Sequence, residues 1–198
     1  MKKALIVVDV QRDFCEGGAL GVEGGNDVAE KIARYIDEHD RDGEYRMVVF
    51  SQDWHRWDSS NGGHFAEKGA QPNYVDTWPE HCLAGTRGAE LHPAVRDYAS
   101  GAQIIRKGQN RPAYSAFEGT TPGEIAMPLQ KLLDSADIEA VDIVGIATDH
   151  CVKATALDAV KGGFKTTVML DLTAGVAPES TEAAIKEMSE AGVQRARA

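Results

Sequence analysis

The chain has 198 residues, of which 42% are hydrophobic and 26% are charged, and this size and composition predict one globular domain spanning residues 1–198. Its net charge of -10 argues against a nucleic-acid partner, because affinity for phosphates comes largely from Lys and Arg, and no apolar run approaches the ~20 residues that a membrane helix needs. Three cysteines are too few for a disulfide scaffold, which favours the reducing cytoplasm.

The chain begins with MKKALIVVDV, which is basic and then apolar, as a signal peptide is. The apolar part ends at Asp9 without a small-residue cleavage site, so we interpret residues 4–10 as the first strand. Further segments rich in β-branched or large aliphatic residues predict strands at 44–53, 140–147 and 164–172, and a weaker one at 102–107. These runs are continuous rather than alternating, as is typical of strands covered on both faces.

Helical patterns separate several of these strands, at about 26–40, 121–135, 149–161 and 179–191. Glycines follow three of the helical segments, as helix stop signals do. Strands that alternate with helices predict an α/β fold, doubly wound, with a mostly parallel sheet and helices on both faces. The C-terminal GVQRARA fits either a last edge strand or a frayed tail.

The predicted strands end in chemically active side chains. Ligands of an open parallel sheet bind outside the carboxyl ends of its strands. Asp9 ends the first strand, Asp53 and His55 the second, Lys107 the weak one, and the TDHC sequence at 148–151 the fourth. An acid, a metal-type pair, an amine and a thiol are therefore expected at one edge.

Residues 53–100 break the alternation and hold several histidines without clean periodicity, and a loop this long is usually functional. Residues two apart in an extended strand end share a face, so Asp53 and His55 can point at one ion. His81 supplies a third ligand and His64 a possible fourth. One carboxylate with two or three histidines suits Zn²⁺, Fe²⁺ or Mn²⁺ and does not distinguish among them. A D-x-H sequence alone occurs by chance; the histidines together favour a metal site.

Cys151 follows GIATDH, where a strand turns into a helix. In the first turn, with Thr148 or Asp149 as N-cap, unpaired N–H groups and the helix dipole favour a thiolate and can bind an oxyanion. A small buried hydrophobic residue is the alternative for this position, and we interpret Cys15 and Cys82 in that way. His150 is a poor base for Cys151, because adjacent helical residues do not face each other.

Asp9 and Lys107 are better partners for this thiol. Taken alone, Asp9 is better interpreted as a strand-end acid that caps a helix N-terminus, and Lys107 as a solvated strand end. Together with Cys151 they form a charge-balanced triad. Half ionisation of a thiol at pH 7 needs roughly 2 kcal/mol, and an ammonium ~4 Å away in a partly buried site supplies about 4 kcal/mol. Asp9 can accept the thiol proton and return it to a leaving group.

Five segments carry a resemblance to a known family. They are VVDVQRDFCEGGALGV, SQDWH, DTWPEHCLAGTRGAELHP, RKGQNRPAYSAFEGT and VGIATDHCVKATALDA. In this order they resemble segments of the nicotinamidases in the isochorismatase-like cysteine hydrolase superfamily, and the resemblance runs from about residue 4 to about 190. GIATDHC and the extra His64 resemble the nicotinamidase/pyrazinamidase type.

The resemblance implies the isochorismatase-like hydrolase fold and several site assignments. It implies a cis peptide between Ile146 and Ala147, which would aim the N–H groups of Ala147 and Cys151 at an oxyanion. It implies the catalytic triad Asp9, Lys107 and Cys151, and a flat pocket for a pyridine ring lined by Phe14, Trp78 and Tyr114.

The resemblance also implies a single divalent metal ion, Zn, Fe or Mn, held by Asp53, His55 and His81. That ion would bind the ring nitrogen and orient the substrate rather than activate the nucleophile. His64 is a fourth ligand in some members, but the His55-to-His64 interval is longer here. Direct ligation by His64, ligation through water, and no ligation therefore all stay open.

The implied enzyme is a metal-dependent cysteine amidohydrolase that converts nicotinamide to nicotinate and ammonia, and pyrazinamide to pyrazinoate, through a thioester acyl-enzyme in NAD salvage. One alternative is a related amidohydrolase acting on a carbamoyl or ureido compound, although such relatives generally lack the metal cluster. An isochorismatase, which does not need the cysteine, fits less well. A metal-binding or regulatory module with a dead active site is disfavoured by the intact triad. Whether the chain is a monomer or a homo-oligomer is not readable from the sequence.

Overall fold

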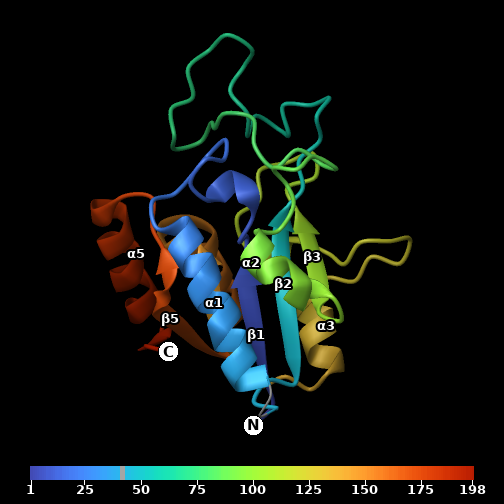
Figure 1. The fold of residues 1–198 in the computed structure, drawn as a ribbon, viewed down its shortest axis with the longest axis vertical. Coiled ribbons are helices and arrows are strands. Elements are labelled where there is room, and N and C mark those ends of the chain that lie inside the picture. Colours follow the sequence, from blue (N-terminus) through green and yellow to red (C-terminus); the bar gives the residue numbers. More distant parts are fainter. Residues whose placement is uncertain (41–42) are drawn as a thin grey trace.

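The computed structural model describes residues 1–40 and 43–198, and within them six strands form one parallel sheet in the order β3-β2-β1-β4-β5-β6 (Figure 1). Every pair of neighbouring strands is parallel. The strands are β1 (Lys3–Val8), β2 (Met47–Asp53), β3 (Gln103–Lys107), β4 (Ala140–Ile146), β5 (Lys165–Ala174) and β6 (Gln194–Ala196). The predicted α/β fold with a doubly wound parallel sheet is therefore confirmed.

Helices cover both faces of the sheet. The α-helices are α1 (Gly25–Asp40), α2 (Pro93–Arg96), α3 (Leu129–Ser135), α4 (Lys153–Lys161) and α5 (Pro178–Glu190). Helices α1 and α2 lie in front of the sheet in Figure 1 and pack into one hydrophobic core, whereas α3, α4 and α5 contribute to a second core on the other face. Three short 3₁₀ helices are η1 (Arg12–Phe14), η2 (Asp97–Ala99) and η3 (Ala116–Glu118), and η4 (Thr148–Val152) is a short π-helix.

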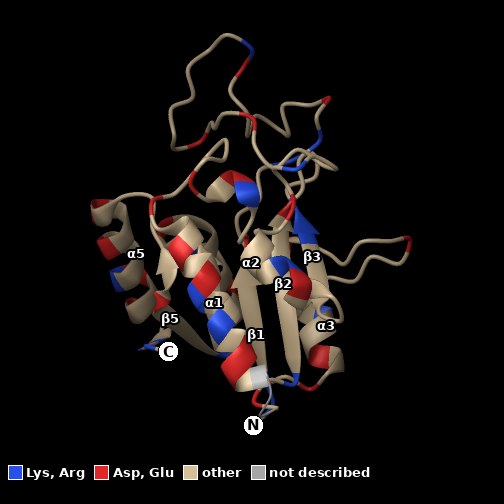
Figure 2. Ribbon diagram, viewed as in Figure 1, with Lys and Arg blue, Asp and Glu red and all other residues tan. Residues whose placement is uncertain are grey.

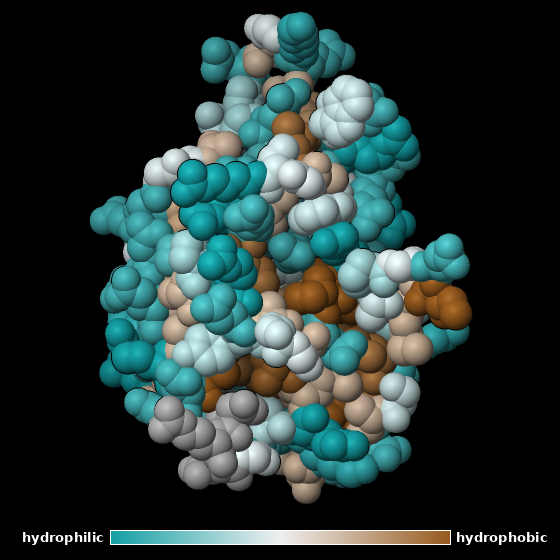
Figure 3. Space-filling view, turned by 45° about the vertical axis from the view of Figure 1, so that its right-hand side comes forward, coloured by the Kyte–Doolittle hydropathy of each residue, from teal (hydrophilic) through white to brown (hydrophobic). Residues whose placement is uncertain are grey.

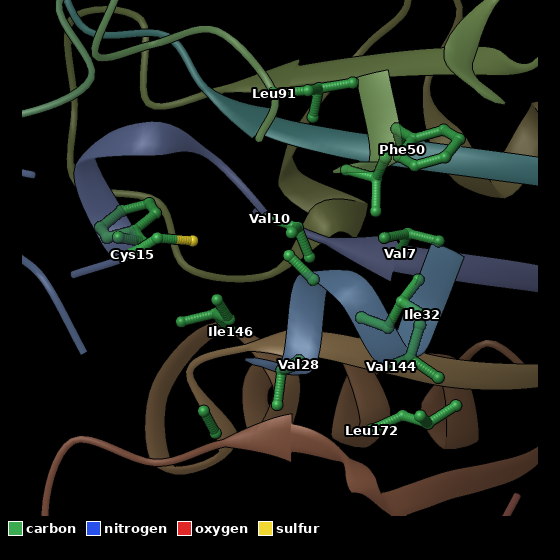
Figure 4. Close-up of a cluster of buried hydrophobic side chains, with 14 of the residues drawn as sticks. Val7, Val10, Cys15, Val28, Ile32, Phe50, Leu91, Val144, Ile146 and Leu172 are labelled. Carbon is green, nitrogen blue, oxygen red and sulfur yellow. The ribbon is translucent and has the colours of Figure 1, made fainter. Parts of the chain in front are cut away.

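Strand β1 shows why its sequence is apolar at successive positions. Leu5 and Val7 face the core beneath α1, while Ala4, Ile6 and Val8 face the opposite core, and all five are fully buried. Successive side chains of a strand point to opposite faces, so a strand with two covered faces needs an unbroken apolar run. Figure 4 shows Val7 on the α1 side, with labelled side chains from α1, β4 and β5.

Two predicted elements are wrong in extent. The helix expected at 121–135 begins only at Leu129, and the residues before it form the arm that projects at the right of Figure 1. Pro128 cannot donate an N–H within a helix and restricts the residue before it, and Gly123 has a positive φ of 113°. The strand expected at 44–53 begins at Met47. The C-terminal segment forms the edge strand β6, so the frayed-tail alternative is wrong there.

The segment after β2 runs above the carboxyl edge of the sheet, mostly as loops, before α2 begins (Figure 1). Acidic and basic residues are mixed along α1 and α5 in Figure 2, so the net charge of -10 is not gathered on one helix. The face seen in Figure 3 is mostly hydrophilic, with hydrophobic patches between the polar groups. Among the described residues, no helix combines the length and apolar character that crossing a membrane requires.

Candidate active site

Asp9, Lys107 and Cys151 come together beyond the carboxyl ends of β1, β3 and β4. Lys107 Nζ lies 2.8 Å from Asp9 Oδ2 and 3.5 Å from Cys151 Sγ. The residues are 0%, 2% and 6% exposed. An ammonium between a carboxylate and a thiol is the arrangement that the strand ends predict, and it places a base and a cation beside a nucleophile.

Ser51 fixes the carboxylate of Asp9, and sequence reasoning missed it. Its Oγ donates to Asp9 Oδ1 at 2.6 Å and accepts from Asp9 N at 3.2 Å. Ser51 precedes Asp53 by two residues in β2, so both side chains point to the same face of the strand. That spacing, in a strand otherwise rich in apolar residues, was the available signal.

The titration of the triad differs from the sequence-based expectation. Burial raises the pKa of the Cys151 thiol well above its usual range; Lys107 lowers it, but Asp9 and Asp53 raise it further. Burial raises the pKa of Asp9 as well, and Lys107 offsets this in part. The sequence-based expectation assumed a partly buried thiol whose pKa one ammonium lowers. In the structure the site is fully buried, and two carboxylates lie beside that one ammonium. The thiol therefore rests protonated and needs a base at the moment of attack.

Lys107 also links the triad to the candidate metal ligands. Its Nζ forms a very short ion pair with Asp53 Oδ1 and donates to Ala113 O at 3.3 Å. Burial alone would lower the pKa of Lys107, but Asp53 and Asp9 raise it well above its ordinary value. The ammonium therefore stays charged and balances both carboxylates.

Asp53, His55, His64 and His81 form the candidate metal site. All four are buried, and one ligand atom from each lies within 4.8 Å of the others. His55 Nε2 is 3.3 Å and His81 Nε2 is 3.6 Å from Asp53 Oδ2. The structure thus brings together every residue that the sequence proposes as a ligand, His64 included.

The hydrogen bonds of the histidines fit a cation among them. His55 Nδ1 bonds to Gly108 O at 2.8 Å and His81 Nδ1 to Pro79 O at 2.7 Å. A carbonyl only accepts, so each Nδ1 carries a proton, and the Nε2 atom that faces the Asp53 carboxylate is the nitrogen whose lone pair can bind a metal. Lone pairs and a carboxylate repel one another unless a cation lies between them.

His64 gives a second reason for a cation. Among the described residues, neither of its ring nitrogens has a hydrogen-bond partner, although the side chain is buried. Burial lowers the pKa of His64 to about 3, so the ring is neutral and both nitrogens cannot be donors. Buried polar groups are normally paired, so an orphaned imidazole beside a carboxylate fits a divalent metal.

Gln11 holds Asp53 through its main chain, and sequence reasoning missed this residue too. Its Nε2 donates to Asp53 O and to Ala89 O, both at 2.9 Å, and its Oε1 accepts from Asp53 N at 2.8 Å. Gln11 is fully buried and follows Asp9 by two residues. One amide therefore connects the loop after β1 to the end of β2.

A cavity of about 320 Å³ opens onto Cys151 and onto three of the candidate ligands, Asp53, His64 and His81. Phe14, Trp78 and Tyr114 line it, as the resemblance implies, and Trp78 Nε1 donates to Tyr114 OH at 3.0 Å. His150, which the sequence left without a role, also lines it and meets the Trp78 ring edge-on at a centroid distance of 5.2 Å. The walls are mostly aromatic and aliphatic, so the cavity suits a flat ring.

The nucleophile turn departs from the expected helix start. Cys151 lies in the short π-helix η4. Its N-cap is Ala147, which makes no side-chain hydrogen bond, so the expected cap by Thr148 or Asp149 is wrong. Thr148 Oγ1 instead donates to Thr173 Oγ1 at 2.9 Å. The peptide between Ile146 and Ala147 is cis, and both residues line the cavity with Cys151.

The Asp149 carboxylate accepts hydrogen bonds from the start of α5 and from the residues just before it. It accepts from Val176 N at 2.9 Å and from Ser180 Oγ at 2.5 Å. Burial would raise the pKa of Asp149, but these bonds lower it. Because Val176 lines the cavity, Asp149 joins the nucleophile turn to one cavity wall.

Cys15 and Cys82 are buried free thiols, as expected. Cys15 belongs to the core beneath α1, where it is labelled in Figure 4, and burial raises its pKa to about 12. Burial also raises the pKa of Cys82 well above its usual range. Neither thiol is therefore ionised at neutral pH.

The chain is similar to known proteins over nearly its whole length. The family described as the Isochorismatase domain matches residues 3–197. A nicotinamidase/pyrazinamidase of Mycobacterium tuberculosis is 45% identical over 192 residues, which cover 97% of this chain and 97% of that protein.

Solved structures share the fold. The pyrazinamidase of Pyrococcus horikoshii in complex with zinc matches with a TM-score of 0.80 and 36% identity over 100% of both chains. The yeast nicotinamidase bound to the inhibitor nicotinaldehyde matches with a TM-score of 0.84 and 30% identity, covering 99% of this chain and 100% of that one.

Proposed function

This chain belongs to the isochorismatase family, and we propose that it is an amide hydrolase that converts nicotinamide to nicotinate and ammonia. One observation carries the proposal: one mostly apolar cavity is lined by a buried thiol, which an ammonium links to a carboxylate, and by three of the four candidate metal ligands. The thiol and its base can act on an amide carbon, and the ligand cluster can hold an aromatic nitrogen heterocycle beside them. Relatives named nicotinamidase or pyrazinamidase support the same proposal.

Acylation begins with transfer of the Cys151 proton to Asp9. Burial raises the pKa of the Cys151 thiol, which keeps it protonated at rest, and it raises the pKa of Asp9, which makes that carboxylate a better proton acceptor as sulfur attacks. Sulfur forms a bond to the amide carbon, and the carbonyl π electrons move to oxygen. The N–H groups of Ala147 and Cys151 are the proposed donors to that oxyanion.

Collapse of the tetrahedral intermediate breaks the C–N bond. Asp9 gives its proton to the departing nitrogen, ammonia leaves, and a thioester links the nicotinoyl group to Cys151. Asp9 is then a carboxylate again and takes a proton from water, which attacks the thioester carbon. The C–S bond breaks, Cys151 takes that proton from Asp9, and nicotinic acid is released and loses its proton to solvent as nicotinate. Ser51 keeps the Asp9 carboxylate in one orientation throughout.

Lys107 steadies the charges in this cycle. Its ammonium contacts Asp9 and Asp53 and lies 3.5 Å from the sulfur, so it stabilises a thiolate as the proton leaves. It does not transfer a proton in this scheme, because its pKa is raised well above the ordinary value.

Asp53, His55 and His81, with His64 as a fourth residue, would hold one divalent ion. When bound, that ion supplies a Lewis-acidic site for a ring nitrogen of the substrate. Zn, Fe and Mn all suit this ligand set, and the Pyrococcus horikoshii relative was solved with zinc. Phe14, Trp78 and Tyr114 would hold the flat ring between them.

We place pyrazinamide among the substrates, because a pyrazine ring has the same flat shape and a nitrogen in the corresponding position. The physiological setting that we propose is NAD salvage in the cytoplasm, where buried free cysteines remain reduced. A carbamoyl or ureido substrate is the second candidate, but the aromatic walls of the cavity favour a ring over a strongly polar chain.

The test is release of nicotinate and ammonia from nicotinamide by the purified protein, before and after chelation. We expect release in equal amounts, loss on chelator treatment, and recovery with Mn²⁺, Fe²⁺ or Zn²⁺. Release that ignores a chelator shown to remove all bound metal would contradict the metal role and leave the thiol chemistry standing. No release by the metal-loaded, reduced protein would contradict nicotinamide as substrate, and ureido compounds would be assayed next.

A further inference from the structure

Asn61 lies in the loop between the candidate ligands His55 and His64 and has no exposed surface. Its φ is 51°, a left-handed conformation that Asn tolerates better than most residues do. A buried amide has two donor hydrogens and an acceptor oxygen that must be satisfied, so its partners show which segments it holds.

The Asn61 amide is fully used. Its Nδ2 donates to Arg56 O at 2.9 Å and to Ser59 O at 3.1 Å, and its Oδ1 accepts from Arg56 N at 2.9 Å and from Asn110 N at 3.2 Å. Arg56 directly follows His55. One side chain therefore binds both main-chain groups of the residue next to a candidate ligand.

The bond to Asn110 joins the loop to the turn after β3. In that turn Gly108 O accepts from His55 Nδ1 at 2.8 Å. The His55 ring and the Asn61 amide are thus anchored to the same three-residue segment. The loop cannot shift relative to this turn without breaking bonds of both side chains.

His64 has no comparable anchor of its own. Among the described residues its ring nitrogens have no hydrogen-bond partner. Its main chain is held by His64 N donating to Asn61 O at 3.3 Å and by Trp78 N donating to His64 O at 2.9 Å. The position of the ring therefore depends on the loop that Asn61 folds.

We propose that Asn61 is the positioning residue that keeps His64 among the metal ligands despite the long His55–His64 interval. Without the amide, four hydrogen bonds are lost and the loop relaxes. His64 then moves out of the site, and only Asp53, His55 and His81 remain as ligands. The inference rests on the proposed metal site and does not require that nicotinamide be the substrate.

The test is a double-mutant cycle on zinc affinity, measured by competition of the protein with a chromophoric chelator. Asn61→Gly removes the amide and fits a positive φ without strain. We expect it to weaken zinc binding about 10- to 100-fold, the range found when groups behind metal ligands are removed. His64→Ala should weaken binding at least as much. The double variant should bind zinc as His64→Ala does, because Asn61 acts through His64.

Asn73→Ala is the matched control. Asn73 folds the neighbouring loop with Oδ1 accepting from the N–H groups of Val75, Asp76 and Thr77 at 2.8–3.0 Å. It too is an asparagine that caps a loop, but it is exposed and its bonds stay within its own loop. Its loss should leave zinc affinity unchanged.

Two outcomes would overturn the inference. Wild-type zinc affinity in Asn61→Gly shows that the amide does not hold a ligand. If the double variant loses zinc affinity by the product of the two single losses, Asn61 acts on a ligand other than His64. If Asn61→Gly does not fold, Asn61→Asp replaces it in the cycle, since Asp tolerates this backbone and its charge affects both backgrounds equally. A wild-type protein that binds no zinc would contradict the metal site itself, whatever its amidase activity.

Discussion

The sheet has a polar cluster at each end, fully buried at the carboxyl end and largely buried at the amino end, and the two clusters differ in how their groups are paired. At the amino end, Lys3, Tyr35, Tyr45 and Asp142 form what we term the basal network. Tyr45 OH donates to Asp142 Oδ2 at 2.9 Å, Tyr35 OH donates to Tyr45 OH at 2.6 Å, and Lys3 Nζ lies 2.6 Å from Asp142 Oδ2. Among the described residues, no buried side-chain nitrogen or oxygen of these four lacks a partner.

The cluster at the carboxyl end is incompletely paired. Three ring nitrogens of His55 and His64 have no partner among the described residues, and two Nε2 atoms face the carboxylate of Asp53. A satisfied buried network gives stability and a unique arrangement, whereas a half-satisfied one is costly unless something completes it. Both clusters contain a lysine, a carboxylate and ring side chains, so composition does not separate them. The hydrogen-bond pairing of their groups does separate them. It indicates a structural role for the fully paired amino end and a ligand-binding role for the incompletely paired carboxyl end.

The largest expected effect is loss of the thiol at the carboxyl end. Cys151→Ala should lower the rate of nicotinate release by at least about 10³-fold, because no other group in the cavity can form the thioester. Cys15→Ala, which removes a buried thiol from the core beneath α1, is the matched control and should retain activity while losing some stability. If Cys151→Ala kept most of its kcat, Cys151 would not be the nucleophile and would differ in no functional way from the structural cysteines.

Metal should stabilise the carboxyl end and leave the basal network unaffected. At a free Zn²⁺ concentration 100 times the Kd, binding adds about 2.7 kcal/mol to the free energy of unfolding. Urea unfolding with and without zinc measures this increment. In His81→Ala the increment should shrink, whereas in Tyr45→Phe it should be unchanged. An equal loss in both variants would show that the pairing difference has no bearing on metal binding.

Tyr45→Phe should have a smaller effect, on stability only. It removes the bond to Asp142 and leaves the Tyr35 hydroxyl without its acceptor, which costs about 2 kcal/mol of unfolding free energy. Urea unfolding gives the loss, and the amidase rate of the folded variant should stay within about twofold of wild type, since no reacting group lies at this end. A large fall in kcat would mean that the basal network takes part in function.

The smallest effect is the alkaline pH dependence of stability. Burial raises the pKa of Tyr45, and bonds to Asp142 and Glu44 raise the pKa of Lys3 even though burial lowers it. Both groups therefore keep their protons to higher pH in the folded chain than in the unfolded one. The unfolded state binds fewer protons above about pH 10, so the free energy of unfolding falls as pH rises, by at most about 1.4 kcal/mol per pH unit per group.

Burial raises the pKa of Cys151 as well, so this thiol adds to the loss of stability, and the difference between the wild-type and Tyr45→Phe curves isolates the contribution of the phenol. The loss above pH 10 should be shallower in Tyr45→Phe. Parallel curves for the two proteins would show that the phenol titrates at its ordinary pKa and is not held by the basal network.

The sequence predicted those parts of the site that regular structure positions. Asp9, Lys107 and Asp53 follow buried apolar runs, and parallel strands bring their carboxyl ends to one edge. The order of the strands did not have to be known, because every strand ends at that edge. The arm before α3 escaped prediction because its helical spacing concealed the effect of Pro128 on the backbone.

Loop-borne and supporting residues could not be placed in the same way. Whether His64 reaches the ligand cluster depends on hydrogen bonds of Asn61 to segments about 5 and 49 residues away, which periodicity does not report. Gln11 and Ser51 look like ordinary polar residues until the register of β1 and β2 is known. The raised pKa of Cys151 depends on full burial beside two carboxylates, and burial at a strand-to-helix turn is decided by the loops that cover it.

Rapid acid quench of a single turnover tests directly whether the incompletely paired end is a cysteine amidase. Metal-loaded protein in excess would be mixed with nicotinamide, quenched over a time course, and digested for mass spectrometry. We expect ammonia to appear before nicotinate, and the peptide that contains Cys151 to carry a nicotinoyl group that rises and then decays. Ammonia and nicotinate that form together, with no acyl group on Cys151 at any time, would mean that water attacks the amide directly and would contradict the thioester mechanism.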